Sequence, residues 1–202
     1  RVNIKDKIDV LEIEKRAFIG GKFVDAVDGM VINKISSADG RDLSGLASCK
    51  QEDIEIAVDA AKNIFRSRIW SDKDPSEKKA TMLRLADLME ENREELALLD
   101  TIETGRAFIN YYEDSIPKAV EAVRYFAEAI DKQYDHAIPP RANCFATITR
   151  APLGVVGCIT PWNDPLVPAM WKMAPALLMG NSVVMKPAEE SSFSLLKVAH
   201  LA

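Results

Sequence analysis

Residues 151–190 read APLGVVGCITPWNDPLVPAMWKMAPALLMGNSVVMKPAEE and carry more information on the fold than the rest of the chain. Residues 154–159 are a short, mostly β-branched apolar run, typical of a strand buried on both faces. The prolines within 160–165 cannot donate to a strand ladder, so the strand ends there. Residues 167–179 are apolar on nearly all sides and predict a helix that stops at a glycine–asparagine pair. Residues 182–186 predict a second strand.

A strand, a helix and a second strand in this order predict a βαβ unit, which implies a parallel sheet with a right-handed crossover. Open α/β sheets bind ligands in the crevice outside the carboxyl ends of their strands. Polar residues follow both predicted strands, with Thr160 and Asn163 after the first and Lys186 and Glu189 after the second. We therefore expect a ligand site at this edge of the sheet.

Several motifs of this unit resemble the cofactor region of the NAD(P)-dependent aldehyde dehydrogenase superfamily. They are Pro161-Trp162-Asn163, Trp171-Lys172, Pro175-Ala176-Leu177, Gly180-Asn181 and Lys186-Pro187-Ala188-Glu189. Upstream, residues 18–23 resemble the family's opening hairpin and residues 103–106 its helix-ending motif. The resemblance implies an α/β fold, namely the amino-terminal part of an aldehyde dehydrogenase-like fold. It would contain helices, the start of a parallel Rossmann-type sheet and the strand of an oligomerisation arm.

The resemblance also implies a division of the chain. Residues 1–142 would form the amino-terminal hairpin and the helical part of the cofactor-binding domain, 143–152 the arm strand, and 153–202 the first βαβ unit of the NAD-binding domain. Residues 134–142 are polar with two prolines and predict a loop. The alternating segment 144–150 predicts a strand. In the family its partner strand would come from the carboxyl-terminal end of the protein, and an edge strand inside one subunit is an equal alternative.

Hydrophobic periodicity and capping residues predict the remaining elements. We expect a hairpin over 17–24 and helices over 51–67, from 75 through 89, over 94–103 and from 117 to 133.

The resemblance assigns the cofactor to residues after the two strands. The matching positions are Ile159, Thr160, Pro161, Trp162, Lys186, Ala188 and Glu189. The Glu189 carboxylate can accept hydrogen bonds from both hydroxyls of a ribose, and the Lys186 ammonium can donate to them. Because Glu189 would repel a 2′-phosphate, NAD is the expected cofactor, and the Lys186 charge keeps NADP as a second option. The alternative is a surface ion pair between the two side chains.

Two residues are candidates for catalysis. The Asn163 amide can donate to an oxyanion as charge develops on an aldehyde oxygen, whereas the alternative is a turn asparagine that bonds its own backbone. Some family members assign the lysine that matches Lys172 to proton relay with the general base. The alternative is a lysine that reaches the surface from an apolar helix.

Glu103, with the backbone near Lys34 and Ile35, matches a cation site of several family members. Carboxylate and carbonyl oxygens suit a hard monovalent or calcium-like ion. Many members have aspartate at this position, and a glutamate at a helix end is also common on any protein surface.

The resemblance implies NAD-dependent oxidation of an aldehyde to a carboxylic acid through a cysteine thiohemiacetal. In the family, the nucleophilic cysteine and the general-base glutamate lie downstream of the lysine–proline–alanine–glutamate motif. We therefore expect the covalent chemistry to lie outside this chain, and a homodimer or homotetramer for the full-length protein. The alternative is a truncated, non-catalytic module that binds nucleotide or assembles with partners. Ser115-Ile116-Pro117 and residues 127–132 resemble members that act on ω-amino aldehydes.

Composition argues against other functions. The 202-residue chain has a net charge of −5, whereas nucleic-acid binding needs clustered Lys and Arg. No apolar run approaches the ~20 residues that span a bilayer, so we expect no membrane partner. Cys49, Cys144 and Cys158 are far apart and in no CxxC pattern, which disfavours disulfides and zinc and fits a reducing cytoplasm.

Overall fold

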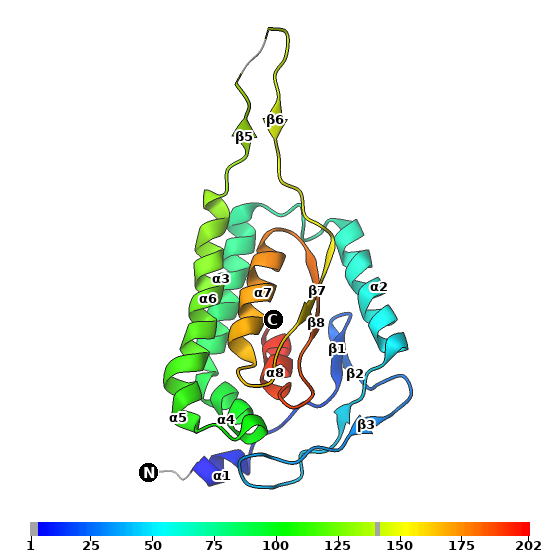
Figure 1. Cartoon of the computed structure of the whole chain (residues 1–202), viewed down its shortest axis with the longest axis vertical. Helices are drawn as coiled ribbons and strands as arrows, with labels where there is room; N and C mark the ends of the chain where they lie inside the picture. Colours follow the sequence, from blue (N-terminus) through cyan, green and yellow to red (C-terminus); the bar gives the residue numbers. More distant parts are fainter. Residues whose placement is uncertain (1–3, 140–141) are drawn as a thin grey trace.

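The computed structural model of the chain describes residues 4–139 and 142–202 (Figure 1). The helices, in chain order, are α1 (Ile4–Ile8), α2 (Gln51–Ser67), α3 (Pro75–Glu91), α4 (Arg93–Thr104), α5 (Phe108–Asn110), α6 (Ile116–Ala129), α7 (Leu166–Leu178) and α8 (Phe193–Leu201). A π-helical turn, η1 (Tyr111–Ser115), precedes α6 and a 3₁₀ turn, η2 (Ile130–Lys132), follows it. The strands are β1 (Ala17–Ile19), β2 (Lys22–Val24), β3 (Val31–Ile32), β4 (Leu46–Ala47), β5 (His136–Ala137), β6 (Thr147–Ile148), β7 (Val155–Ile159) and β8 (Ser182–Lys186).

The predicted βαβ unit is confirmed. β7 and β8 pair in parallel from Val155–Ser182 to Ile159–Lys186, and α7 makes the crossover between them. Gly180, with a φ of 86°, ends the crossover helix in the left-handed region that glycine adopts without strain. The two-stranded sheet lies between α7 and α2 (Figure 1).

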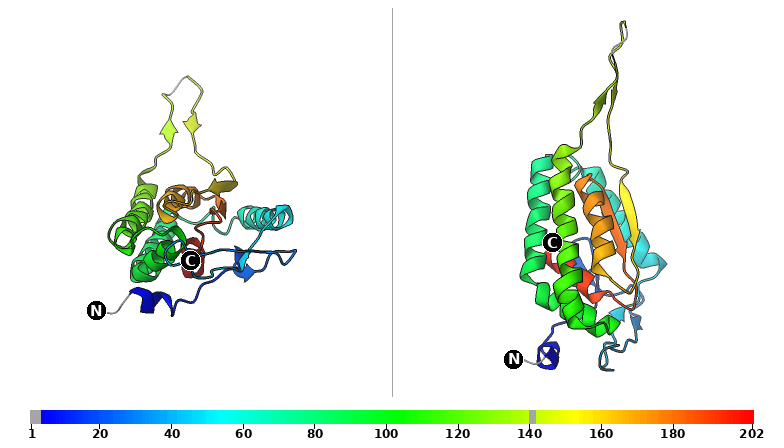
Figure 2. Two further views of the ribbon diagram at one scale, coloured as in Figure 1. Left: turned by 60° about the horizontal axis from the view of Figure 1, so that its bottom comes forward. Right: turned by 60° about the vertical axis from the view of Figure 1, so that its left-hand side comes forward.

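The largest hydrophobic core lies between α3, α6 and α7, which stand side by side in both views of Figure 2. The predicted helix from residue 75 begins as expected, because the Glu77 carboxylate accepts a hydrogen bond from the Asp74 N–H at 3.3 Å. Its predicted apolar positions are all buried: Met82, Leu85, Ala86 and Met89.

The predicted helix from residue 117 begins earlier, since η1 and α5 extend it back to Phe108. Pro117 has no N–H to close an α-helical turn, and the π-helical turn directly precedes it.

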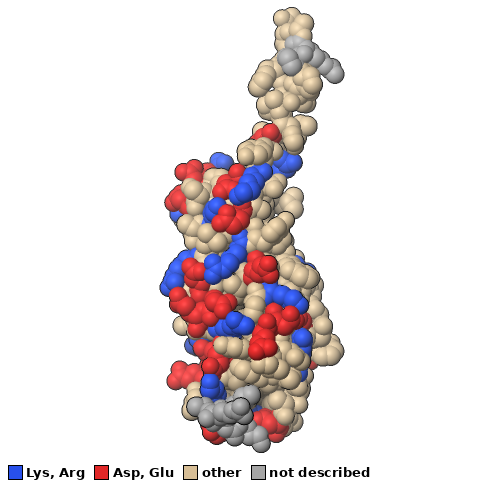
Figure 3. Space-filling model, turned by 90° about the vertical axis from the view of Figure 1, so that its left-hand side faces the viewer, with Lys and Arg blue, Asp and Glu red and all other residues tan. Residues whose placement is uncertain are grey.

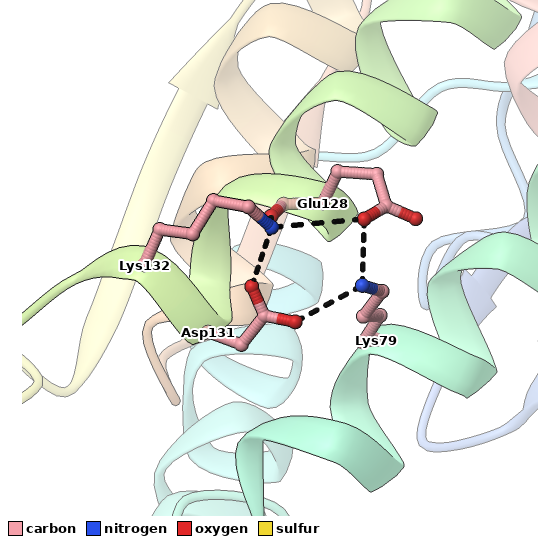
Figure 4. Close-up of polar contacts among 4 residues, drawn as sticks. All are labelled: Lys79, Glu128, Asp131 and Lys132. Carbon is pink, nitrogen blue, oxygen red and sulfur yellow. Dashed lines mark hydrogen bonds and ion pairs between the residues drawn. The ribbon is translucent and has the colours of Figure 1, made fainter.

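Polar contacts join α3 to the end of α6. The Lys79 ammonium lies 2.6 Å from a Glu128 carboxylate oxygen and 3.0 Å from an Asp131 oxygen, and Lys132 contacts the same two carboxylates (Figure 4). Figure 3 shows Lys, Arg, Asp and Glu side chains mixed over this face, without a patch of one sign. Each of these exposed pairs contributes little by itself. Among the described residues, no helix is long and apolar enough to cross a membrane.

Helix α2 has the predicted bounds, but Asp53 is its only buried residue. Ile54 and Ile64 stay 42% and 51% exposed. They border an apolar groove of about 1160 Å³ between α2 and β8, so the helix contacts the sheet without closing over it.

The segment after α6 forms a hairpin that projects from the body (Figures 1 and 2). β5 pairs antiparallel with β6, with His136 opposite Ile148 and Ala137 opposite Thr147. The predicted loop over 134–142 is therefore wrong at residues 136–137, and its residues 140–141 lie outside the described residues. The strand predicted over 144–150 is present at Thr147–Ile148, where it pairs with β5, and a further partner from the end of the protein stays a prediction. Among the described residues the ladder consists of two strand pairs and the hydrogen bond from the Ile138 N–H to the Ala146 carbonyl, which is too short for a pattern in the sequence to reveal.

Gly105 provides a test of the packing at the end of α4. Its φ is 78°, and an added Cβ would lie 3.0 Å from the Ser37 carbonyl oxygen. Gly40 has a similar φ of 75° and no atom within 4 Å of an added Cβ. We expect Gly40→Ala to cost about 1–2 kcal/mol through backbone strain alone. Gly105→Ala should cost a further 1–3 kcal/mol or so through overpacking.

Urea unfolding followed by circular dichroism measures both losses. Equal losses in the two variants would show that the Ser37 segment moves aside without cost.

Candidate functional site

The two loops of the predicted site begin side by side. Ile159 and Lys186 are neighbours at the carboxyl ends of β7 and β8, and the Thr160 N–H donates to the Lys186 carbonyl at 3.2 Å. Ile159 and Trp162 are 73% and 57% exposed, so they present open apolar surface at this edge. The fold therefore brings together the residues that the sequence predicted at the ends of the two strands.

In the loop after β8, the Lys186 ammonium lies 2.9 Å from a Glu189 carboxylate oxygen. This hydrogen bond from Lys186 is the main reason that the pKa of Glu189 is lowered. Both side chains are about half exposed, which matches the surface-pair alternative. Ala188 is buried, and its carbonyl accepts from the Ser191 N–H at 3.1 Å, which fixes the turn of the loop.

In the loop after β7, Asn163 is exposed. Within residues 4–139 and 142–202 its side-chain amide has no hydrogen bond, so the structure does not show the predicted alternative of a bond to its own backbone. The Asn163 carbonyl accepts from the Tyr111 hydroxyl at 3.3 Å. That hydroxyl also lies 2.9 Å from Thr104 Oγ1, and the Tyr111 side chain is fully buried. The loop is thus fixed through its backbone, while its amide faces solvent.

Asp164 anchors the same loop from the next residue. Its carboxylate accepts from the Ser115 hydroxyl at 3.2 Å and lies 3.7 Å from the Arg106 guanidinium. Burial raises the pKa of Asp164, although Ser115 and Arg106 act in the opposite direction. Sequence reasoning missed these contacts; Arg106 was noted only as part of the helix-ending motif.

Lys172 is on the exposed side of α7, as expected for a lysine that reaches the surface. Its charge acts on the buried Cys158 thiol, whose pKa is raised by burial and partly lowered by Lys172. Burial also raises the pKa of the Cys49 thiol, and Cys144 is exposed in the projecting hairpin. A thiolate nucleophile is favoured by a lowered pKa, which is the opposite of the direction at Cys49 and Cys158.

Glu103 has different partners from those predicted. Its carboxylate is buried, forms an ion pair with the Lys34 ammonium, and accepts hydrogen bonds from the N–H groups of Ser192 at 2.9 Å and Phe193 at 2.8 Å. The described part of the chain contains no group of three His, Cys, Asp or Glu residues that could hold a metal ion. The contacts of Glu103 form an ion pair and a cap at the start of α8, and the cation site expected from one carboxylate and backbone carbonyls stays a prediction.

Asp100 is the least expected residue near the site. It is fully buried, and neither carboxylate oxygen has a hydrogen-bond partner among the described residues. Burial raises the pKa of Asp100 well above the ordinary value, although the nearby Ser194 hydroxyl acts in the opposite direction, and the charges of Glu103 and Asp164 act in the same direction as burial. A fully buried carboxyl without a partner favours the neutral, protonated form.

A sequence model described as the aldehyde dehydrogenase family matches residues 23–202. The chain is 41% identical over 198 residues to the NADP/NAD-dependent aldehyde dehydrogenase PuuC of Escherichia coli (strain K12), which covers 98% of this chain and 40% of that protein. It is 41% identical over 192 residues to an aminoacetaldehyde dehydrogenase of Pseudomonas aeruginosa, covering 95% of this chain and 39% of that protein. The chain thus spans about 40% of the length of the curated relatives it matches.

Solved structures share the fold. The P. syringae indole-3-acetaldehyde dehydrogenase AldA, in complex with NAD+ and IAA, has a TM-score of 0.96 at 42% identity, covering 98% of this chain and 40% of that one. The gamma-glutamyl-gamma-aminobutyraldehyde dehydrogenase of Burkholderia cenocepacia J2315 has a TM-score of 0.96 at 41% identity, with 98% and 40% covered. These similarities confirm the predicted fold class, including its place in the amino-terminal part of the fold.

Asp100 makes stability depend on pH. A carboxyl whose pKa is raised on folding makes its full contribution to the free energy of unfolding at pH values below its unfolded pKa, which is near 4. This contribution is lost as the pH rises through the folded pKa. Asp100→Asn keeps the shape and cannot ionise. We expect the variant and wild type to differ little at acidic pH. At pH ~8 the variant should be the more stable of the two, because the buried carboxyl of the wild type would have to ionise or stay protonated at a cost that the amide does not have.

Thermal unfolding at several pH values measures this difference, with the exposed Asp59→Asn as the control. A Tm difference between Asp100→Asn and wild type that stays constant with pH would show an ordinary pKa for Asp100.

Proposed function

The chain belongs to the aldehyde dehydrogenase family, and we propose that it forms the cofactor side of an enzyme that oxidises an aldehyde to a carboxylic acid with NAD. The observation that carries this proposal is the pairing of Ile159 with Lys186, which places two loops at one sheet edge. One loop presents the Asn163 amide and the other the Lys186–Glu189 pair. The aldehyde dehydrogenases among the relatives support the reaction class.

We assign NAD to these two loops because similar structures contain NAD+. PuuC is an NADP/NAD-dependent enzyme, so NADP stays a second option. The residues fit such a ligand: the Glu189 carboxylate can accept from two ribose hydroxyls while the Lys186 ammonium donates to their lone pairs. Exchanging their exposed mutual contact for ribose contacts costs little. Residues Ile159, Thr160, Pro161, Trp162 and Ala188 would line the adjoining nicotinamide and ribose. When bound, the nicotinamide accepts a hydride from the substrate.

The proposed role of Asn163 follows from its free amide. When a cysteine thiolate adds to the aldehyde carbon, the carbonyl π bond breaks and the oxygen becomes the oxyanion of a thiohemiacetal. The Asn163 amide would donate to this oxyanion. The contacts of Tyr111 and Asp164 hold the backbone of this loop, which limits the region that the Asn163 amide can reach.

The nucleophile itself is not among the three cysteines in this proposal. Burial raises the pKa of both Cys49 and Cys158, and Cys144 lies in the projecting hairpin. We propose that the nucleophilic cysteine and the general-base glutamate belong to a further part of the protein, in keeping with the greater length of its relatives. The exposed Lys172 would then relay protons with that base.

We retain the division into residues 1–142, 143–152 and 153–202 as a proposal, with β5 added to the arm. The projecting hairpin supports an arm that joins subunits of a homodimer or homotetramer. Three unpaired cysteines support a reducing cytoplasm as the compartment. An ω-amino aldehyde is the proposed substrate class, supported by the similarity to aminoacetaldehyde and gamma-glutamyl-gamma-aminobutyraldehyde dehydrogenases.

Asn163→Ala in the full-length enzyme tests the catalytic role. Loss of one oxyanion donor should lower kcat by roughly two to three orders of magnitude and leave NAD affinity nearly unchanged. Single-turnover NADH formation measures the chemical step, and the exposed Asn110→Ala is the matched control. An unchanged single-turnover rate in Asn163→Ala would show that Asn163 is a turn residue without a role in the chemical step.

Glu189→Gln tests the ribose contact. The amide keeps the shape of the side chain and removes its repulsion of a 2′-phosphate, an interaction of up to about 4 kcal/mol for unit charges 4 Å apart at an effective dielectric near 20. We expect kcat/KM to shift toward NADP, while NAD weakens by about tenfold through loss of a charged hydrogen bond.

The measurement is the ratio of kcat/KM for the two cofactors. Glu190→Gln, one residue further along and also exposed, is the control. A ratio that moves by less than about twofold in Glu189→Gln would place Glu189 away from the ribose.

A further inference from the structure

Lys34 is a buried lysine whose ammonium joins three separate segments. Its side chain is 7% exposed and that of its partner Glu103 is 0% exposed. The ammonium also donates to the Glu189 carbonyl at 2.8 Å and lies 4.4 Å from the centre of the Phe193 ring. A carboxylate, a carbonyl and an aromatic face all favour a cation at this point.

The Glu103 carboxylate is used on both oxygens. Oε1 accepts from Lys34 and from the Ser192 N–H at 2.9 Å, and Oε2 accepts from the Phe193 N–H at 2.8 Å. The two N–H groups belong to the start of α8. The carboxylate therefore links the end of α4 to α8, and Lys34 links both to the loop after β8.

A metal ion does not fit these residues. The carboxylate and the carbonyl of residue 189 that could bind it already converge on the Lys34 ammonium. A metal ion beside the ammonium would also meet like charge in a buried position, where repulsion is strong. We infer that the Lys34 ammonium takes the place of the metal cation predicted at Glu103. It acts as a built-in cation that holds the loop after β8 against α4 and α8.

The inference has a measurable consequence. Lys34→Met removes the charge and leaves the Glu103 carboxylate buried beside the Glu189 carbonyl, which creates a vacancy for a small cation. Removing one member of a buried ion pair is strongly destabilising because the other charge loses its partner. A potassium ion can fill such a vacancy, whereas choline is too large to enter.

The experiment compares thermal unfolding of the chain in potassium chloride and in choline chloride of equal concentration. We expect the same Tm in both salts for wild type. In choline chloride, Lys34→Met should unfold about 6–15 °C below wild type, and potassium should restore at least about half of this loss. In Lys34→Met/Glu103→Gln the potassium effect should disappear, because the carboxylate charge is gone.

Lys50→Met is the matched control, because the Lys50–Asp28 pair is exposed on both sides. It should change Tm by less than about 2 °C in either salt. Stabilisation of wild type by potassium over choline would show that a metal binds despite Lys34 and would overturn the inference. So would a Lys34→Met variant that has the same Tm in both salts, or that folds in neither.

A second measurement uses the wild-type chain. Reductive methylation under native conditions, followed by peptide mass spectrometry, should modify Lys50 and leave Lys34 unmodified. Equal modification of the two lysines would show that the Lys34 ammonium is not held in the buried position.

Discussion

The parallel pairing of β7 with β8 is the constraint on which the site depends. Parallel strands need a crossover, so α7 must pass from one end of the sheet to the other, and both strands then end at the same edge. Asn163 and Glu189 are 26 residues apart along the chain (189 − 163), yet they follow neighbouring strands. The backbone ladder sets the starting point of both loops.

Buried polar contacts with the helical part of the chain then position the loops after β7 and β8. Tyr111 and Ser115, both in η1, reach Asn163 and Asp164 in the first loop. Lys34 and Glu103 reach the second loop and the start of α8 in an analogous way. Desolvating such groups is costly, and Asp100 shows this cost without a compensating partner. The helical part of the chain thus does more than cover the sheet, since it supplies the groups that hold both loops.

Local signals predicted most of the fold, and long-range side-chain contacts account for what was missed. The apolar runs, prolines and caps that define β7, α7, β8 and α3 lie within a few residues of one another, so periodicity reveals them. The Tyr111–Asn163 bond spans 52 residues, and no spacing rule connects such positions. The family resemblance placed Glu103 near the Lys34 backbone, 69 residues away, but it did not predict the ion pair between their side chains. The sequence therefore identified the edge of the sheet and several residues on it, while the supporting residues beneath it required the structure.

The projecting hairpin has a consequence for the thermodynamics of association. An isolated two-stranded hairpin is at best marginally stable in water, and the described strands of this one, β5 and β6, have two residues each. Phe145 and Ile148 on it are exposed, so the chain offers apolar surface without a covering layer. Fixing the backbone of each such residue costs about 1–2 kcal/mol. Contacts with a surface that covers the hairpin must supply this free energy of ordering, so the measured affinity would be weaker than the contacts alone would give. The change in heat capacity on binding would instead report the apolar area that is buried.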